Sequence, residues 1–502
     1  MSDEAAPVLT SSAPPSLLRS GMLSLVTSAA PLVVALVALP LLARHLGIER
    51  LGLLALAWAW LGYAALLDFG LGRALTRMVA ASDAGESLEA PIGAFVSTAH
   101  RLLTVVGSVL GVIGVSLAPW YVDRLLHVSV ELQRDALMSA IVFSMTVPAV
   151  TGASVPRAVL EARQQFRDVN FVRLPVSVGS FAVPLLLLPF TASLTVVAMT
   201  LAVLRVWAWW RYSRLARAAM PPRPHDAPRL AYLPPLMRAG AWMTISNVLS
   251  PLMTVADRFL IASVVSVSAV ALYAVPWEAI MKLGIVPGAL TMVLFPAITR
   301  ASAMETSRLV PLHAAGVRLL TLVVTPICAL AALLAPWLIQ FAGGAQYAGV
   351  SVTVLRILSV GVAANCIAAV PYTLLQASGR ARWTATLHLF EIVPFVSLLW
   401  FAVHQWGIVG AAVAWTTRVV IDAALMAWRA QSVAPLPRSL LLLNGAGVSL
   451  VILCAWLGAS GRAGHRATLI LALLVLTLTP LVLWMRRSEV ERRVLGEASG
   501  RG

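Results

Sequence analysis

Uncharged apolar stretches long enough to cross a lipid bilayer recur along the whole chain. Leu441–Ser460, Ala467–Met485 and Phe181–Leu204 contain no charged side chain. The hydrocarbon core of a bilayer is roughly 30 Å thick, which an α-helix of about 20 apolar residues spans. Only 12% of the 502 residues are charged, about half the fraction typical of a soluble globular protein. The sequence therefore predicts an all-α polytopic membrane protein without a sizeable soluble domain.

The spacing of the apolar stretches predicts about 14 transmembrane helices. They are expected at 20–42, 51–70, 102–120, 136–156, 171–190, 192–210, 239–262, 268–296, 316–341, 350–376, 384–403, 408–428, 440–458 and 467–485. The first of these is longer than the apolar region of a cleavable signal peptide, so we expect it to remain as a span.

The basic residues predict the orientation of the spans. With the N-terminus in the cytoplasm, 27 basic residues fall on the cytoplasmic side and 6 on the outer side. Because positive charge concentrates in cytoplasmic loops, both termini are expected to be cytoplasmic. The net charge of +16 is spread between spans, which argues against nucleic-acid binding. The basic, Pro-rich segment 214–238 is expected to be a cytoplasmic linker that contacts anionic membrane lipid.

An internal match predicts a two-fold plan. Val155–Ala162 and Val370–Ala377 share a pattern at an offset of 215 residues, and Arg167 and Arg382 match at the same offset. An even number of spans per repeat makes the repeats parallel, related by an axis along the membrane normal. We therefore expect two parallel six-helix repeats plus two C-terminal helices. The expected divisions are a cytoplasmic tail at 1–19, bundles at 20–213 and 239–430, extra helices at 431–486 and a tail at 487–502.

Ionisable side chains inside the expected spans are the first candidates for function, because each costs several kcal/mol unless it is paired or hydrated. They are Asp68, Asp257, Arg258, Glu278, Lys282, Arg356, Glu391, Arg418 and Asp422. Glu278 with Lys282 and Arg418 with Asp422 have i,i+4 spacing, so each pair lies on one helical face. Two interpretations stay open: structural ion pairs inside a bundle, or the lining of a cavity that handles a charged headgroup or a coupling ion.

Several segments resemble a known family. Leu41–Gly47, Gly52–Leu54 and Leu67–Gly72 are similar, in order and spacing, to the opening of Wzx-like polysaccharide flippases. These belong to a superfamily that also contains MATE-like multidrug exporters and the lipid II flippase. Further similar segments are Asp257–Ile261, Tyr273–Val275, Phe295–Ala297, Leu375–Arg380 and Gly407–Ala412. The resemblance covers residues 20–430.

The resemblance implies a transporter of the bacterial inner membrane. It would move undecaprenyl-diphosphate-linked oligosaccharide from the inner to the outer leaflet by alternating access, for polysaccharide or O-antigen (lipopolysaccharide) synthesis. On this interpretation Arg258, Arg356, Lys282 and Arg418 are candidates for binding the diphosphate, because a basic side chain complements its charge. Candidates for proton or Na⁺ coupling are Asp257, Glu391, Asp68, Glu278 and Asp422. For Asp68, capping of backbone groups at a helix bend is an alternative.

Two other classes of function compete with the flippase. A MATE-like, ion-coupled exporter of small molecules or drugs has the same fold but would favour acidic and aromatic cavity residues. An enzyme of glycan polymerisation or transfer needs a large outer loop, whereas Tyr121–Arg134 is the longest expected here. No Gly-x-x-x-x-Gly-Lys phosphate loop is present, so an ATP-driven pump is also disfavoured. We expect a non-enzymatic protein without cofactor or metal, whose partners include a polysaccharide polymerase and glycosyltransferases.

Overall fold

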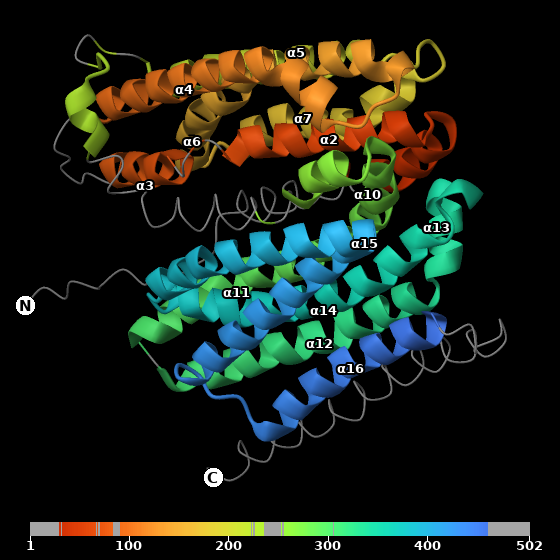
Figure 1. Ribbon diagram of the computed structural model, residues 1–502. Coiled ribbons are helices and arrows are strands. Elements are labelled where there is room, and N and C mark those ends of the chain that lie inside the picture. The colour runs from red at the N-terminus through yellow and green to blue at the C-terminus, as the bar shows by residue number, and fades with distance from the viewer. Residues whose placement is uncertain are drawn as a thin grey trace, which may run out of the picture.

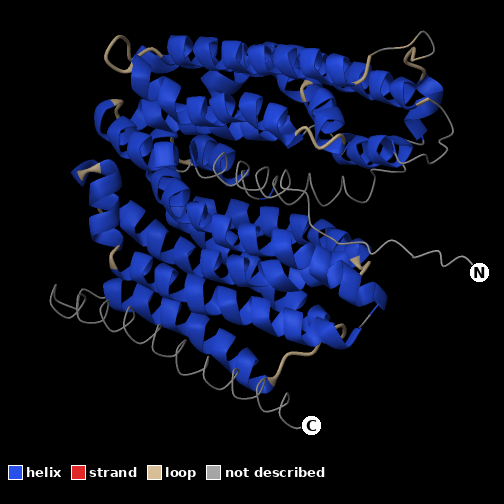
Figure 2. Ribbon diagram, turned by 180° about the vertical axis from the view of Figure 1, so that it is seen from behind, coloured by secondary structure: helices blue, strands red, loops and turns tan. Residues whose placement is uncertain are grey.

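A computed structural model describes residues 30–459 except 32, 67, 69–70, 84–90, 222, 224–225, 235–252, 254–255 and 305. Throughout the described part every regular element is a helix (Figure 2). The expected span 467–485, both tails and most of the expected span 239–262 lie outside the described residues. The all-α prediction is confirmed, as is the polytopic membrane class, because nine described helices are long and apolar enough to cross a membrane.

The described helices form two bundles (Figure 1). The first bundle contains α2 (Ile48–Leu66), α3 (Leu71–Asp83), α4 (Ile92–Trp120), α5 (Val130–Gly152), α6 (Ser154–Ala162), α7 (Phe166–Leu187) and α8 (Leu194–Ala219). Within it α5 packs against α4, α8 and α2, and the short helices α3 and α6 pack against each other. Helical residues 33–45 precede α2.

The second bundle begins with helical residues 256–264. It continues with α10 (Val267–Met281), α11 (Ile285–Met304), α12 (Leu309–Leu333), α13 (Ala335–Gly343), α14 (Val350–Ala377), α15 (Ala381–Gln431) and α16 (Arg438–Ala459). α14 is its centre, since it packs against α10, α11, α12, α15 and α16. Its buried residues include small side chains and Gly361, which allow this close approach of helices.

The sequence predicts most of these helices, including the turn between two expected spans inside α15. α15 is two helices joined at Gly407, whose φ of 56° and ψ of −133° lie outside the helical region. Glycine adopts positive φ without steric cost. At Gly410, a β-carbon would meet the backbone carbonyl of Ala402 on the other side of the turn. The two glycines therefore allow the chain to reverse tightly between the spans 384–403 and 408–428.

Three expected spans are interrupted in the structure, and the first of them, 136–156, is broken at Ala153 between α5 and α6. The span 268–296 is broken at Lys282–Gly284, a short 3₁₀ turn that separates α10 from α11. Pro287 follows in the first turn of α11, and a proline removes the backbone donor that would continue the preceding helix. The expected span 316–341 is wrong at its end, because α12 stops at Leu333 and Pro336 opens the separate helix α13.

The two repeated segments end in the same turn. Gln164 and Gly379, 215 residues apart, have φ of 56° and 79°. The amide of Gln165 donates to Leu160 O at 2.9 Å, and the amide of Arg380 donates to Leu375 O at 2.8 Å, at the same offset. This hydrogen bond together with a left-handed residue is a helix-ending motif that satisfies free carbonyl groups. The equivalence supports the parallel repeat, although α6 is separated from α5 by a turn whereas α14 is continuous.

The bundles meet at one end. Arg44 Nη2 donates to Phe341 O at 2.7 Å, and Gln346 Nε2 donates to Ala43 O at 2.6 Å. At the same end α2 packs on α10, where Gly52 lies against the backbone carbonyl of Val267. We call this the junction end. It carries α10 and α13 on the right of Figure 1, and the described helices of the two bundles diverge toward the opposite end, where α3 lies.

Asp135 of α5 fixes the start of α8. Its carboxylate accepts hydrogen bonds from the amides of Leu194 (2.6 Å) and Thr195 (2.9 Å) and from the Ser193 hydroxyl (2.9 Å). The first amides of a helix have no partner within the helix, and a carboxylate there also interacts favourably with the helix dipole. Asp135 therefore joins two helices of the first bundle at the junction end.

Asp135→Ala should destabilise the protein by about 1–3 kcal/mol, because four donors, including the Thr195 hydroxyl, lose a charged acceptor. The measurement is the thermal unfolding midpoint of purified protein in detergent, which should fall. Glu131→Ala is the matched control, since Glu131 is an exposed residue of the same helix. Equal midpoints for both variants would show that this cap contributes nothing.

Candidate functional site

A chain of ion pairs lies in the second bundle beside the first. Arg258 Nη2 is 3.1 Å from Glu278 Oε1, and Lys282 Nζ is 2.8 Å from Glu278 Oε2. Glu278 and Lys282 pair as their i,i+4 spacing predicts, and Arg258 joins them from a separate helical segment. The side chain of Arg258 is only 6% exposed, whereas that of Lys282 is 28% exposed. We call Asp257, Arg258, Glu278 and Lys282 the interface cluster.

Lys282 connects this cluster to the first bundle. Its ammonium lies 5.1 Å from the ring centroid of Phe181, which belongs to α7. A cation over an aromatic face is attracted by the ring quadrupole. Lys282 also begins the 3₁₀ turn between α10 and α11, so its side chain projects from an interruption in the helix. The cluster therefore lies where the two bundles face each other.

Asp257 is fully buried and is held by hydrogen bonds. Tyr273 donates its hydroxyl to Asp257 Oδ2 at 2.6 Å, and the amide of Arg258 donates to Oδ1 at 2.7 Å. The Arg258 guanidinium turns instead toward Glu278 and the ring of Trp277, whose centroid is 5.7 Å away. Neighbouring residues of a helix point to different sides, and the side chains of Asp257 and Arg258 accordingly have different partners.

Aromatic side chains surround the interface cluster. Tyr273 stacks on Trp277 at 5.6 Å between centroids, and Trp277 meets Trp415 edge-on at 4.9 Å. All three rings are buried. They connect α10 to the second half of α15, so they fix the direction of the charged groups on α10.

A second group of ionisable side chains lies between the two halves of α15. Arg418 Nε is 3.1 Å from Glu391 Oε2, and His388 Nε2 is 3.7 Å from Asp422 Oδ1. Glu391 Oε1 and Asp422 Oδ1 are buried and have no hydrogen-bond partner among the described residues. Tyr372 of α14 stacks on His388 at 6.2 Å between centroids. We call His388, Glu391, Arg418 and Asp422 the α15 cluster.

The α15 cluster corrects one expected pairing. Helical spacing predicts Arg418 with Asp422, but the structure pairs Arg418 with Glu391 and Asp422 with His388. The reversal at Gly407 brings the first half of α15 beside the second, so a partner from the other half replaces the one along the same helix. His388 is not among the residues predicted from the sequence, although it lies three residues before Glu391 and therefore on the same helical face.

Arg356 and Asp68 lie outside both clusters. Arg356 Nε is 3.4 Å from Ala332 O, and a β-carbon at Gly458 would come within 3.0 Å of Arg356 Nε, so this side chain lies between α12, α14 and α16. Asp68 lies at the break between α2 and α3, and a β-carbon at Gly72 would be 2.9 Å from its Oδ2. Asp68 therefore lies against the first turn of α3, as the capping interpretation predicts.

The site residues that the sequence does not reveal are mostly aromatic. Phe181, Tyr273 and Trp277 hold charged groups in place, yet aromatic residues in an apolar span look like ordinary packing. One signal is present in the sequence: Tyr273 and Trp277 are four residues apart and share one face of α10, with Glu278 next to Trp277.

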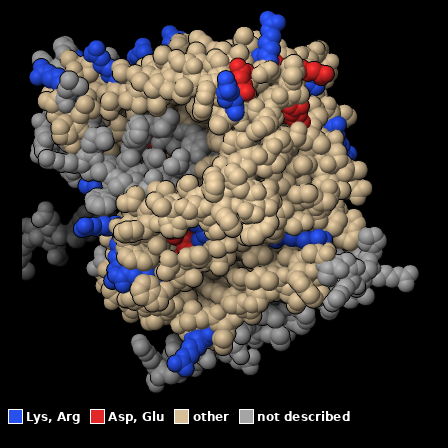
Figure 3. Space-filling view, viewed as in Figure 1, with Lys and Arg blue, Asp and Glu red and all other residues tan. Residues whose placement is uncertain are grey.

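Figure 3 shows how few charged side chains the molecule carries on the side seen in Figure 1, with a small acidic and basic group visible in the second bundle.

Two bundles that meet at one end and hold charged clusters among membrane-crossing helices define a polytopic membrane transporter. The sequence model of the polysaccharide biosynthesis protein family matches residues 18–302, more than half of the chain. The chain therefore belongs to the polysaccharide biosynthesis protein family.

Individual relatives agree with this assignment. A Shigella flexneri protein named as an O-antigen transporter is 28% identical over 419 residues, which cover 82% of this chain and 97% of the relative. The lipid II flippase MurJ, in an inward closed conformation, matches with a TM-score of 0.69 at 11% identity, covering 95% of this chain and 99% of that chain. An inward-facing multidrug resistance MATE family transporter matches with a TM-score of 0.62 at 15% identity, covering 83% and 96%. The two structures show a shared fold.

Proposed function

We propose that this protein moves a lipid-linked oligosaccharide, carried on undecaprenyl diphosphate, from the inner to the outer leaflet of the bacterial inner membrane. The observation that carries the proposal is the interface cluster, which places Arg258 and Lys282 in the second bundle beside the first, with Lys282 against Phe181. Family membership supports transport of a polysaccharide precursor. With both termini in the cytoplasm, the junction end faces outward, so the divergent end admits substrate from inside.

The interface cluster is balanced without substrate. Asp257, Arg258, Glu278 and Lys282 carry two negative and two positive charges when all four are ionised. A diphosphate that binds Arg258 and Lys282 must therefore replace Glu278 as their partner, because an uncompensated buried charge is strongly unfavourable. A proton or Na⁺ taken up at Glu278 would release both cations, and this exchange would link ion movement to substrate binding.

The α15 cluster is the second proposed ion-coupling site. It brings two acids, Glu391 and Asp422, together with Arg418 and His388, and one buried oxygen of each acid has no hydrogen-bond partner among the described residues. With Arg418 as the one permanent cation of the cluster, one bound proton on a carboxyl group or on His388 makes the cluster neutral. We propose that this cluster binds a proton. Its net charge would then change by one unit between the proton-free and the proton-bound state.

Glu391→Gln should reduce proton-driven transport by about tenfold, because glutamine keeps the shape but cannot exchange a proton. Transport is measured in proteoliposomes with and without an imposed pH gradient, and the variant should lose its response to the gradient. Glu131→Gln, at an exposed position of α5, is the matched control and should respond as the original protein does. A full response in Glu391→Gln would exclude this residue from coupling.

A drug exporter of the same fold is the alternative function. The interface cluster argues against a drug exporter. Both of its carboxylates already have partners, and its partly exposed side chain is the cation Lys282. The two functions separate in a bacterium that lacks its own O-antigen transporter. Expression of this chain should restore surface polysaccharide without raising drug resistance. Raised resistance without surface polysaccharide would support the exporter.

We propose that the polymerase and glycosyltransferases of the same glycan are the partners of this protein.

A further inference from the structure

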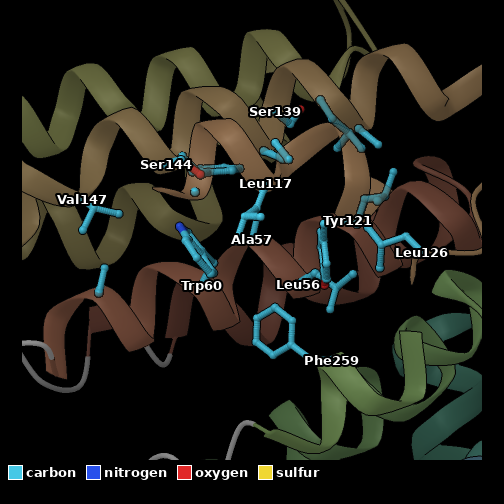
Figure 4. A pocket seen from close by; sticks show the side chains of 18 of the residues that line it. Leu56, Ala57, Trp60, Leu117, Tyr121, Leu126, Ser139, Ser144, Val147 and Phe259 are labelled. Carbon is cyan, nitrogen blue, oxygen red and sulfur yellow. The ribbon is translucent and has the colours of Figure 1, made fainter. Parts of the chain in front are cut away.

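An apolar cavity of about 330 Å³ is lined by α2, α4, α5 and the first turn of α8, all in the first bundle, and by Phe259. Figure 4 shows Ala57 and Trp60 on one side of it and Ser139 and Ser144 on another, with Phe259 reaching toward it from the second bundle. Ligand cavities are of this size and are lined mainly by apolar and aromatic groups.

Three polar atoms in the wall of the cavity have no partner among the described residues. They are Trp60 Nε1, Tyr121 Oη and Ser139 Oγ, and all three are buried. A buried donor without an acceptor costs about 1–3 kcal/mol. Such atoms in a cavity wall indicate that a bound molecule or water supplies the acceptor.

The second bundle completes this cavity. The Phe259 ring lies 6.5 Å from the rings of both Trp60 and Tyr121, measured between centroids. Phe259 follows Arg258 on the same helical segment, so one turn of helix presents Arg258 to the interface cluster and Phe259 to the cavity. Separation of the bundles at the junction end would withdraw Phe259, so the cavity is complete only while that end is closed.

We propose that the cavity binds the isoprenoid units next to the diphosphate of the transported lipid. This inference rests on the proposed function. A diphosphate bound at Arg258 would lie beside the helical turn that carries Phe259, and its hydrocarbon chain would reach the apolar cavity past this ring, which lines it. The chain supplies apolar volume, and the ester oxygens at its head supply acceptors. A phospholipid could also supply an apolar chain, but it has no diphosphate that would bind at Arg258 and place the chain in this cavity.

A prenyl chain in this cavity would take part in alternating access. The chain would be held while the junction end is closed and released when Phe259 moves away. A ligand that binds one state better shifts the population toward that state. The loaded lipid would therefore favour the state that is open to the cytoplasmic side until the headgroup moves.

Photo-crosslinking of the full-length protein in nanodiscs tests the location. The probe is a farnesyl diphosphate analogue with a benzophenone on its last isoprene unit, and labelled peptides are identified by mass spectrometry. Label is expected on α2, α4 and α5, with loss of about tenfold in Ala57→Phe, which fills the cavity. Gly62→Phe is the matched control, because a side chain at Gly62 on the same helix meets open space.

The outcomes separate the two proposals. Diphosphate-dependent label that remains in Ala57→Phe, or that falls only on the second bundle, would overturn the cavity assignment and keep the headgroup site. Equal labelling by a benzophenone fatty acid without diphosphate would also overturn it, in favour of a phospholipid chain. Free inorganic diphosphate should compete with the probe. If it reduces the labelling of no variant, the proposed headgroup site itself is contradicted.

Discussion

Arg258→Gln should reduce transport of the lipid-linked oligosaccharide by about 10- to 100-fold. Loss of a hydrogen bond to a charged group costs about 1.5–3 kcal/mol, and each 1.4 kcal/mol corresponds to a factor of about ten. Arg258 is buried and joined to Glu278 at 3.1 Å, so glutamine at this position can neither pair with the carboxylate nor bind phosphate. The measurement is the initial rate of transport in proteoliposomes with matched amounts of protein.

A double variant separates binding from stability. Arg258→Gln alone leaves Glu278 with only Lys282 as its charged partner, and a broken buried pair can destabilise a fold. Arg258→Gln with Glu278→Gln removes both charges, so folding should recover while transport stays low. Arg205→Gln, in α8 and outside both clusters, is the matched control. Recovery of transport in the double variant would mean that Arg258 serves stability alone. We expect a smaller effect at Arg356, which packs between α12, α14 and α16.

Gly52→Val should hold the junction end open. A β-carbon at Gly52 would meet the backbone carbonyl of Val267, so the larger residue forces α2 and α10 apart. Overpacking of this kind costs about 1–3 kcal/mol, which is enough to shift the population of two states by about 5- to 150-fold. We expect transport to fall and a cysteine introduced at Gln346 to react faster with an impermeant maleimide added outside.

The native cysteines do not complicate this measurement, since Cys328, Cys366 and Cys454 are buried. Gly62→Val is the control, because it adds the same side chain to α2 where nothing lies within 4 Å. It should leave both transport and labelling unchanged. Unchanged labelling in a folded Gly52→Val protein would show that this contact does not close the junction end.

The sequence predicts the spans well because each span is a local property. An apolar stretch must be helical in the bilayer to satisfy its own backbone, so Phe181–Leu204 and Leu441–Ser460 can be located without knowledge of their neighbours. Breaks inside spans are harder to locate. Lys282–Gly284 and the end of α12 depend on prolines whose effect on the helix varies with its packing.

The candidate site is only half predictable from the sequence. Glu278 and Lys282 pair along one helix, which the i,i+4 spacing shows. Arg258 with Glu278, and Arg418 with Glu391, join residues from different helical segments. The spacing of residues along one helix cannot predict these contacts, because they depend on how the helices pack. The sequence therefore reveals the charged residues but not these two pairings.

Transport by the purified protein tests the central claim most directly. The protein is reconstituted into liposomes with a fluorescent oligosaccharide on undecaprenyl diphosphate, and a membrane-impermeant quencher reports the leaflet of the fluorophore. We predict that the original protein equilibrates the lipid between leaflets far faster than protein-free liposomes, and that Arg258→Gln with Glu278→Gln does not. Movement no faster than in protein-free liposomes, for a correctly folded protein with an imposed ion gradient, would contradict the account.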